Sequence, residues 1–326
     1  MKTCTSGKGR PKICLGMPLY NQVKFLPEAL SSLRAQTYSD FQLIMVDDST
    51  HPGPGEIAKQ FAAKDSRLCY IKNESRKGLV DNWRACFQRA GDADYFAWVS
   101  DHDVWDHAWL AAMVQVMKAR PDVLLVYPRT VHISSEGERL IRSGRDFLST
   151  DGMSEVERIR TVYRDGPGLF GEMVYGLFRA QALRRCNAFR RLLFPDAILL
   201  LELCFYGDFH QVDAELWFRR HLAPFSISRQ KRSLFVRRPW YIYTPWPLVN
   251  TVALAWNTAI RPNDRDLRLR LLAIRQSIVY LAWSLDRWGE GSWLGSIREW
   301  RKRKKPWMRR MKKRLKRKDE TPEKTS

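Results

Sequence analysis

The sequence predicts an α/β fold in which a mostly parallel β-sheet is flanked by helices and followed by a basic, helical C-terminal region. Short apolar runs alternate with helix-periodic segments at intervals of roughly 25 to 30 residues, as in parallel sheets covered by helices. Polar residues follow several of these runs, and the composition changes after residue 230. The 326 residues, 44% of them hydrophobic, suffice for one large core or for one core with an appendage.

The first hundred residues contain two β-α-β units. Apolar runs predict strands over residues 12–17, 41–46, 68–72 and 95–99. Apolar residues at helical spacing predict helices over residues 25–34, 55–64 and 78–90. Because ligands of such sheets bind at the carboxyl ends of the strands, polar residues at these ends are candidate site residues.

The formal net charge of +21 is concentrated near the C-terminus. Residues 231–326 contain 25 Lys and Arg against 8 Asp and Glu, a net charge of +17, whereas residues 1–230 contain 31 against 27, or +4. The basic character therefore belongs to the C-terminal region, and the part before it has no need of a polyanionic ligand. We predict one domain over residues 1–230 and a second region over residues 231–326.

Cysteine usage and hydropathy indicate the compartment. The six cysteines form no CxxC pair and no metal-ligand spacing, which favours buried thiols in a reducing environment. Residues 1–12 are polar and basic, unlike a secretory signal. The best apolar run, residues 247–260, is shorter than the roughly 18 residues that a spanning helix needs. We expect a cytoplasmic protein that lies on a membrane without crossing it.

Two acidic residues at a strand end suggest a metal site. Asp101 and Asp103 are separated by one residue, and such carboxylates bind Mg²⁺ or Mn²⁺ while substrate phosphates and water complete the coordination. Asp47 and Asp48 end a neighbouring strand, where they offer acceptors to a base or a ribose. The alternative for each group is a capping residue of the next helix.

A phosphate site is predicted where the third helix begins. Arg76, Lys77 and Gly78 open this helix, where backbone N–H groups and the helix dipole favour anions. The sequence contains no GxGxxG and no GxxxxGK[ST] motif, which argues against a dinucleotide dehydrogenase and a P-loop NTPase.

Together these motifs resemble the family 2 glycosyltransferases, which have the GT-A fold. The resemblance covers about 210 of the 326 residues in the same order. Its segments are residues 16–21, 41–50, 67–78 with Asn82, 95–105, 174–179, 196–207 and 216–221. Where many members of the family have an aspartate, this chain has His102, so one carboxylate of the family's metal-binding pattern is missing.

The resemblance implies roles for individual residues. Residues of the nucleotide-sugar site would be Pro18, Tyr20, Asn21, Asp47, Asp48, Arg76, Gly78, Asn82 and Asp101. The metal ligands would be Asp101, Asp103 and His221, with a surface histidine as the alternative for the last. Asp196 would be the base that deprotonates the acceptor hydroxyl, with a helix N-cap as the alternative, and Glu202 would be structural.

The C-terminal region has the composition of a membrane-associating segment. Eight of the 13 tryptophans lie beyond residue 230, and residues 298–318 contain 14 Lys and Arg in 21 positions. Tryptophan and basic residues favour the interface of an anionic bilayer. A solvated basic helix, or disorder over residues 298–326, is the alternative.

The resemblance therefore predicts an inverting glycosyltransferase that transfers a sugar from a nucleotide diphosphate donor to a lipid-linked or cell-surface glycan. The enzyme would act at the inner face of the cell membrane, in the synthesis of a cell-envelope polysaccharide. One alternative is an inactive relative that binds only a sugar nucleotide or a partner. The other is a nucleic-acid-binding protein, which the acidic strand ends and the absence of RRM, KH or zinc patterns disfavour.

Overall fold

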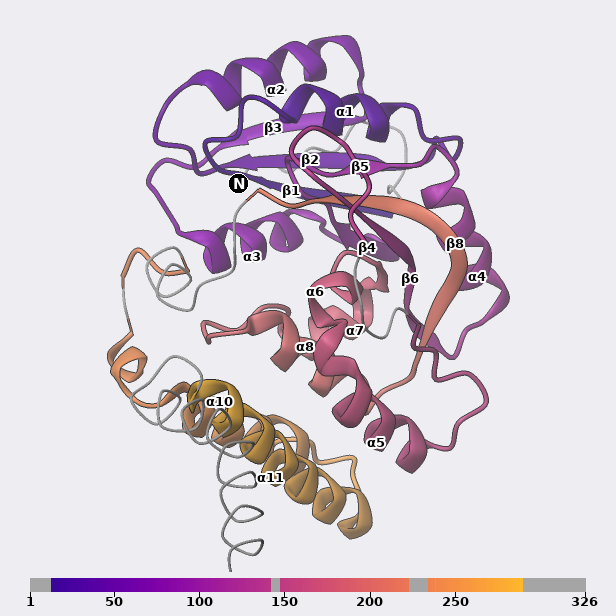
Figure 1. Ribbon diagram of the computed structural model, residues 1–326, viewed down its shortest axis with the longest axis vertical. Helices are drawn as coiled ribbons and strands as arrows, with labels where there is room; N and C mark the ends of the chain where they lie inside the picture. The colour runs from indigo at the N-terminus through magenta and orange to yellow at the C-terminus, as the bar shows by residue number, and fades with distance from the viewer. Residues whose placement is uncertain (1–12, 142–146, 223–233, 238, 290–326) are drawn as a thin grey trace, which may run out of the picture.

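The computed structural model describes residues 13–141, 147–222, 234–237 and 239–289. The described residues form one eight-stranded sheet with helices on both faces (Figure 1). The strands are β1 (Ile13–Leu19), β2 (Gln42–Asp47), β3 (Leu68–Lys72), β4 (Tyr95–Trp98), β5 (Val104–Trp105), β6 (Val123–Ile133), β7 (Leu177–Arg179) and β8 (Asp208–Arg220).

The helices alternate with the strands up to β4, and several helices follow one another in the second half of the chain. They are α1 (Leu26–Arg34), α2 (Gly53–Lys64), α3 (Leu79–Arg89), α4 (Trp109–Ala119), α5 (Glu155–Asp165), α6 (Phe170–Met173), α7 (Ala180–Arg185), α8 (Pro195–Leu203), α10 (Trp246–Ala255) and α11 (Leu267–Gly289). Short helices are η1 (Gly166–Gly168), η2 (Trp240–Tyr243) and η3 (Trp256–Ile260). The predicted strands and helices of the first hundred residues are present, with ends that differ by one or two residues.

The sheet has the order β3-β2-β1-β4-β7-β6-β8-β5. The first four strands pair in parallel, as the sequence predicted. β7 then pairs antiparallel with both β4 and β6, β6 and β8 run parallel, and β5 is antiparallel to β8. The carboxyl ends of β1, β2 and β4 consequently lie at one edge of the sheet, which is where the candidate site residues were expected.

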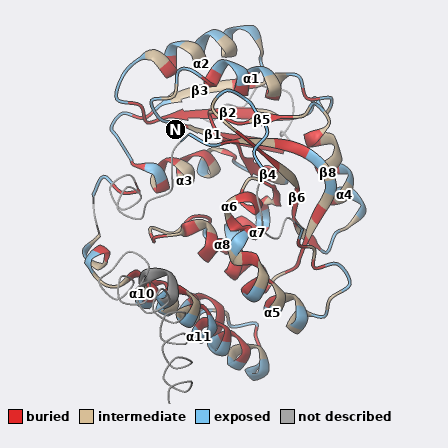
Figure 2. Ribbon diagram, viewed as in Figure 1, coloured by how far each residue is buried: buried red, intermediate tan, exposed pale blue. Residues whose placement is uncertain are grey.

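Alternating side chains divide the core into two clusters on the two faces of the sheet. On β1, Ile13, Leu15 and Met17 pack with α1 and α4, whereas Cys14 points to the opposite face with α3. The same opposite face carries α5 to α8 and the C-terminal helices (Figure 1). Figure 2 shows that the sheet strands are buried along most of their length.

The described part of the C-terminal region packs on this core. Leu234 and Phe235 are 1% and 2% exposed, and Trp246, Leu254 and Ala273 join the cluster that contains the sheet residues of the α3 side. α10 contacts α8, and α11 contacts α5. The division at residue 230 stays a prediction of the sequence, while residues 234–285 share the core of the preceding part.

Two expectations from the sequence change here. Cys14, Cys86, Cys186 and Cys204 are free and buried, as expected, but Cys69 on β3 is disulfide-bonded. The expectation that the cysteines are free thiols is therefore wrong for Cys69. Within the described residues, no helix is both long enough and apolar enough to span a bilayer. The polybasic residues 298–318 and the possible disordered end at 298–326 lie outside the described residues.

Gly16→Ala should destabilise the fold, because an added Cβ would lie 2.7 Å from Cys86 Cβ and 2.7 Å from Phe96 Cζ, where α3 packs on β1. Such overpacking costs about 1–3 kcal/mol in the free energy of unfolding. Urea unfolding measures the loss. Gly168→Ala is the matched control, since nothing lies within 4 Å of its added Cβ. Equal stabilities of the two variants would contradict the packing argument.

Candidate active site

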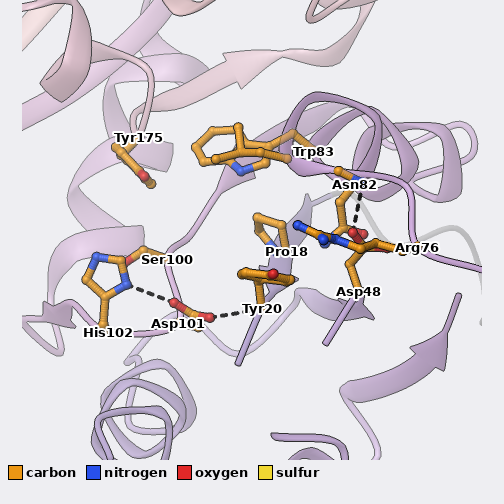
Figure 3. Close-up of a pocket in the computed structure, with 12 residues that line it drawn as sticks. Pro18, Tyr20, Asp48, Arg76, Asn82, Trp83, Ser100, Asp101, His102 and Tyr175 are labelled. Carbon is orange, nitrogen blue, oxygen red and sulfur yellow. Dashed lines mark hydrogen bonds and ion pairs between the residues drawn. The ribbon is translucent and has the colours of Figure 1, made fainter. Parts of the chain in front are cut away.

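A cleft of about 680 Å³ opens at the carboxyl ends of β1, β2 and β4. It brings together seven of the residues that the sequence placed in the nucleotide-sugar site: Pro18, Tyr20, Asp48, Arg76, Gly78, Asn82 and Asp101 (Figure 3). Its remaining lining residues are Leu79, Trp83, Ser100, His102 and Tyr175.

Tyr20 and Arg76 form the exposed side of the cleft. The backbone N–H of Tyr20 donates to Asp101 Oδ2 at 3.2 Å, which fixes the loop after β1 against the loop after β4. The guanidinium of Arg76 lies 5.0 Å from the centre of the Tyr20 ring (Figure 3). An aromatic face beside a guanidinium offers stacking to a base and charge to a phosphate.

Asp48 organises the loop that precedes α3. Its Oδ1 accepts hydrogen bonds from the backbone N–H of Lys77 at 2.6 Å and from Asn73 Nδ2 at 3.1 Å, and its Oδ2 accepts from the N–H of Gly78 at 2.9 Å. The expectation that the N–H groups of Lys77 and Gly78 face a phosphate is therefore wrong, because both donate to Asp48. Arg76, whose side chain lines the cleft, is the cation of this loop that faces the cavity.

Gly78 is required by the local backbone. Its φ is +87°, in the region that favours glycine, and an added Cβ would lie 3.0 Å from Leu234 O and 3.0 Å from Val236 N. The N–H of Val80 also donates to Leu234 O at 3.3 Å. Residues 234–236 thus close one side of the start of α3, so the C-terminal region contributes to the wall beside the cleft.

Asn82 connects α3 to the ends of two strands. It is 2% exposed, its Nδ2 donates to Val46 O at 3.0 Å, and its Oδ1 accepts from Asn73 Nδ2 at 3.0 Å. These bonds hold the helix at a fixed height over the sheet. Asn82 therefore shapes the floor of the cleft as well as lining it.

Asn21 lies beside the cleft and does not line it. Its φ is +57°, its N–H donates to Ser49 Oγ at 3.0 Å, and its Oδ1 accepts from the N–H of Thr50 at 2.9 Å. These bonds join the loop after β1 to the loop after β2. The structure thus gives Asn21 a supporting position.

Asp47 likewise lies behind the cleft, 1% exposed. Burial alone would raise the pKa of its carboxyl, but hydrogen bonds from Ser49, Tyr70 and Lys72 lower it. Tyr70 OH donates to Asp47 Oδ2 at 2.8 Å, and Lys72 Nζ lies 3.2 Å from the same oxygen. Asp47 is therefore an ionised residue that ties β2 to β3.

Asp101 and Asp103 differ in their access to the cleft. Asp101 lines it, and its Oδ1 lies 2.8 Å from His102 Nδ1 (Figure 3). Asp103 is 1% exposed, and its Oδ1 accepts the backbone N–H of Arg220 on β8 at 2.7 Å. The expectation that both carboxylates face solvent is wrong for Asp103, because β8 covers it.

The imidazole of His102 stands between these two carboxylates. Burial alone would lower its pKa, but the contact with Asp101 and the negative charges of Asp103 and Asp101 outweigh burial and raise it. The two carboxylates therefore stabilise the protonated form of His102 relative to a free imidazole.

His221 follows Arg220 and contacts another histidine. Its Nε2 lies 2.7 Å from His132 Nδ1, and His132 Nε2 lies 3.2 Å from Glu172 Oε1. The described residues contain no group of three His, Cys, Asp or Glu side chains arranged to bind a metal. Asp101, Asp103 and His221 therefore do not form the three-residue ligand set that was expected.

The residues present nevertheless fit a divalent cation that is held largely by substrate. Mg²⁺ is commonly bound through one or two carboxylates, with substrate phosphates and water as the other ligands. Asp101 offers a carboxylate at the cleft surface, 8% exposed. Of the three expected ligands, it is the one that lines the cavity.

Asp196 lies in the first turn of α8. Phe194, with φ +53°, occupies the N-cap position and makes no side-chain capping bond, whereas the carboxyl of Asp196 accepts from N–H groups of the first turn, so the capping alternative stays open. Burial raises the pKa of Asp196, and the N–H groups of Ala197 and Asp196 and the charge of Arg219 offset this only in part. A carboxyl with a raised pKa is suited to proton transfer near neutral pH. Its side chain is not among those lining the cleft.

Glu202 has a structural position, as expected. It is 2% exposed, and Arg190 NH2 contacts its Oε2 at 2.7 Å. This ion pair joins the end of α8 to the segment before it. Burial raises the pKa of Glu202, and the charge and hydrogen bonds of Arg190 offset this only in part.

The sequence did not single out the aromatic wall of the cleft. Trp83 and Tyr175 line the cavity with ring centres 5.4 Å apart in an edge-to-face arrangement (Figure 3). Trp83 also stacks on Trp98 of β4 at 5.7 Å. Trp83 follows Leu79 by four residues and shares its helix face, which is the signal that could have identified it. Tyr175 gave no comparable signal, because its position depends on contacts between distant segments.

Comparisons with solved structures define the class of the fold. The chain is similar to Staphylococcus aureus TarS 1–349 in complex with UDP-GlcNAc, with a TM-score of 0.59, 16% identity and coverage of 86% of this chain and 73% of that one. It is also similar to the mannosyltransferase PcManGT of Pyrobaculum calidifontis in complex with GDP-Man and Mn²⁺, with a TM-score of 0.51, 13% identity and coverage of 90% and 80%. The architecture is that of the GT-A glycosyltransferases.

The family follows from the sequence match. Residues 14–190 match the model of glycosyl transferase family 2, and the chain belongs to this family. It is 28% identical over 189 residues to an uncharacterized protein, y4gI, of Sinorhizobium fredii, covering 54% of this chain and 20% of that protein. It is 36% identical over 88 residues to the putative glycosyltransferase EpsE of Bacillus subtilis, covering 27% of this chain and 31% of that protein. The chain thus spans less than a third of the length of either relative.

Asp196→Asn should make the stability less dependent on pH. Because the unfolded chain releases this proton at a lower pH than the folded chain, raising the pH from about 4 through the raised pKa lowers the wild-type free energy of unfolding. Each unit of raised pKa corresponds to about 1.4 kcal/mol. Urea unfolding across this pH range should show the variant gaining stability relative to wild type as the pH rises. Asp213→Asn, at a side chain 74% exposed, is the control. A difference that is constant with pH would contradict the assignment.

Proposed function

We propose that the chain is an inverting glycosyltransferase that uses a nucleotide-diphosphate sugar. The observation that carries the proposal is the cleft at the carboxyl ends of β1, β2 and β4, which gathers seven of the predicted donor-site residues. Family membership supports the reaction class. TarS and PcManGT, whose complexes contain UDP-GlcNAc and GDP-Man, support a nucleotide sugar as the donor.

The donor would lie along the cleft from Tyr20 to Tyr175. Tyr20 and Arg76 would flank the base and ribose, with Pro18 below and Asp48 as a further acceptor. The diphosphate would lie near Asp101 and His102, and the protonated form of His102 would offset part of its charge. The sugar would then approach the aromatic wall.

A divalent cation, Mg²⁺ or Mn²⁺, would be held by Asp101 and the donor diphosphate. Bound there, it would offset the negative charge that develops on the leaving nucleoside diphosphate. PcManGT in complex with Mn²⁺ supports this part of the proposal. Asp103 would support the loop that carries Asp101 through its bond to Arg220.

Asp196 would act as the general base. In an inverting transfer, a carboxylate removes the proton of the acceptor hydroxyl as this oxygen attacks the anomeric carbon from the face opposite the leaving group. The C–O bond to the acceptor forms while the bond to the diphosphate breaks, and the proton moves to Asp196. The raised pKa of Asp196 makes the carboxyl a stronger base than an exposed aspartate.

The acceptor would be a lipid-linked or cell-surface glycan at the inner face of the cell membrane. The charge of +17 after residue 230 supports attraction to an anionic leaflet, at about 1 kcal/mol per basic residue near the surface. The polybasic residues 298–318 would contribute most of this attraction. Synthesis of a cell-envelope polysaccharide is the corresponding process.

Asp196→Asn should lower turnover by about 10²–10⁴-fold and leave donor affinity within about threefold, because a base acts on the acceptor proton and not on the nucleotide. Purified protein is first screened with a panel of nucleotide sugars for release of nucleoside diphosphate, and donor binding is measured by calorimetry. Asp213→Asn is the control.

Unchanged turnover of the Asp196→Asn variant would remove the base assignment. Binding of a nucleotide sugar by wild type, without turnover on any acceptor extract, would favour an inactive relative, for which His102 is the specific observation. Absence of any nucleotide-sugar binding would contradict the proposed function as a whole.

Removal of divalent cations by a chelator should lower turnover at least about tenfold, and Mn²⁺ or Mg²⁺ should restore it. Asp101→Asn should raise the cation concentration needed for half-maximal turnover, since one carboxylate ligand is lost. Substitution of Asp101 tests cation binding better than substitution of Asp103. Because Asp103 is buried under β8, we expect its substitution to impair folding. Full turnover in the presence of chelator would show that positive side chains alone offset the diphosphate charge.

A further inference from the structure

We propose that the outer face of the α10–α11 hairpin is a docking surface for a phospholipid bilayer. The hairpin lies at the end of the molecule opposite α1 and α2 (Figure 1). Its inner side packs on α5 and α8. Its outer side carries the proposed docking surface, which does not include the polybasic residues 298–318.

The exposed positions of α10 and η3 are all apolar. They recur every four residues, which places them on one helix face, and they are Leu248, Val252, Trp256 and Ile260. Val252 is 69% exposed and Trp256 is 55% exposed. A helix face on a protein surrounded only by water normally carries polar residues at such positions.

α11 continues this apolar surface. Its exposed apolar positions follow helical spacing and are Leu267, Leu271, Ile274, Ile278, Val279 and Leu285. Arg268 and Arg275 are the charged residues among the exposed positions between 267 and 285. α10 and α11 lie against each other, so both stripes belong to one hairpin. Figure 2 shows buried and exposed stretches alternating along α11.

The buried side of the hairpin is the more polar side. Asn250, Thr258, Ser277 and Ser284 are each 1% exposed or less, and Gln276 is 5% exposed. Their hydrogen bonds are made within the protein: Asn250 Nδ2 donates to Leu193 O at 2.8 Å, and Thr258 Oγ1 donates to Leu254 O at 2.7 Å. The inner side also carries apolar core residues such as Leu254 and Ala273, so it mixes polar and apolar side chains, whereas the exposed side is almost entirely apolar. A more apolar outer side is the distribution expected where the outer medium is apolar.

The charges on this face favour a bilayer over a second copy of the chain. Between residues 267 and 285 the sequence contains Arg but no Asp or Glu. Two copies packed through this face would bring Arg268 and Arg275 together with no carboxylate from these helix segments to pair with them, whereas lipid phosphates supply the opposite charge. Trp240 and Tyr243 of η2, 81% and 80% exposed, have the amphipathic rings that favour the headgroup region.

No described helix can cross the bilayer. The hairpin would therefore lie in the plane of the interface, with its apolar face among the acyl chains and its arginines at the phosphates. Docking itself does not require sugar transfer. The consequence that it presents the cleft to a lipid-linked acceptor does rest on the proposed function.

Flotation of the full-length protein with vesicles tests the proposal. The vesicles contain phosphatidylcholine alone or with phosphatidylglycerol, in low salt and in 1 M salt, where the Debye length is about 3 Å. Wild type should bind both, more strongly with phosphatidylglycerol, and should retain part of its binding in 1 M salt. Removal of residues 290–326 should abolish most of the salt-sensitive part and leave the salt-resistant part.

The decisive variant is Val252→Glu/Ile278→Glu, which should weaken vesicle binding by roughly tenfold or more. Its matched control is Val23→Glu/Ile141→Glu, which makes the same chemical changes at residues 42% and 101% exposed outside the hairpin and should bind within about twofold of wild type. The uncharged Val252→Ser/Ile278→Ser should also weaken the salt-resistant binding. Circular dichroism and thermal unfolding verify that each variant is folded.

Equal vesicle binding by wild type and the hairpin variants would overturn the proposal. So would a dimer in solution that the hairpin variants dissociate while wild type fails to bind vesicles, since the face would then be an interface between copies. Nucleotide-sugar binding, measured without vesicles, should be equal in wild type and both hairpin variants. If the proposed function is wrong, neither wild type nor the hairpin variants will bind a nucleotide sugar. If the docking proposal is wrong, nucleotide-sugar binding will be normal and only the flotation result will differ from expectation.

Discussion

Four carboxylates buried at the carboxyl ends of parallel strands constrain the arrangement of the candidate site. Asp47, Asp48, Asp101 and Asp103 are each 8% exposed or less. A buried carboxylate without donors is costly, so the chain must place a donor against each one. The loops after β1, β2 and β4 and the start of α3 therefore take the conformations that supply these donors.

The donors come from segments that are far apart in the sequence. Asp48 accepts from the N–H groups of the loop before α3, and Asp103 accepts from Arg220 at the end of β8. The guanidinium of Arg220 in turn contacts His102 O at 3.1 Å and Glu28 Oε2 at 2.7 Å. Satisfying Asp103 thereby joins the first half of the sheet to its last long strand. The acidic residues of the cleft are therefore held by donors from both sides.

Local patterns in the sequence were sufficient for the first half of the fold. The apolar runs and helical spacings up to residue 99 correspond to β1 to β4 and α1 to α3, because each of these elements carries its own periodicity. Seven candidate residues meet in one cleft, since strand ends converge by topology alone. The sequence could not distinguish Asp101 from Asp103, because only the pairing of β5 with β8 covers the second one.

Errors arose where a contact joins segments distant in the sequence. Lys77 and Gly78 were expected to face a phosphate, but their N–H groups donate to Asp48, a residue nearly 30 positions earlier. Trp83 and Tyr175 were not identified as a wall, since their meeting depends on the packing of α3 against the segment after α6. The high positive charge of the region after residue 230 predicts a surface segment and does not indicate that its apolar residues pack on the core.

The C-terminal hairpin supports the segment that carries Asp196. Trp246 of α10 packs on Phe194 with ring centres 4.6 Å apart, and Asn250 Nδ2 donates to Leu193 O at 2.8 Å. Tyr241 OH also donates to Arg191 O at 2.6 Å. Phe194 has a left-handed backbone, an arrangement that persists only where surrounding contacts enforce it. The inner face of the hairpin therefore supports the segment that carries the proposed base, while its outer face is the one that we assign to the bilayer. A bilayer bound to the outer face would be held in a defined orientation to Asp196, because α10 directly contacts the residues that precede Asp196.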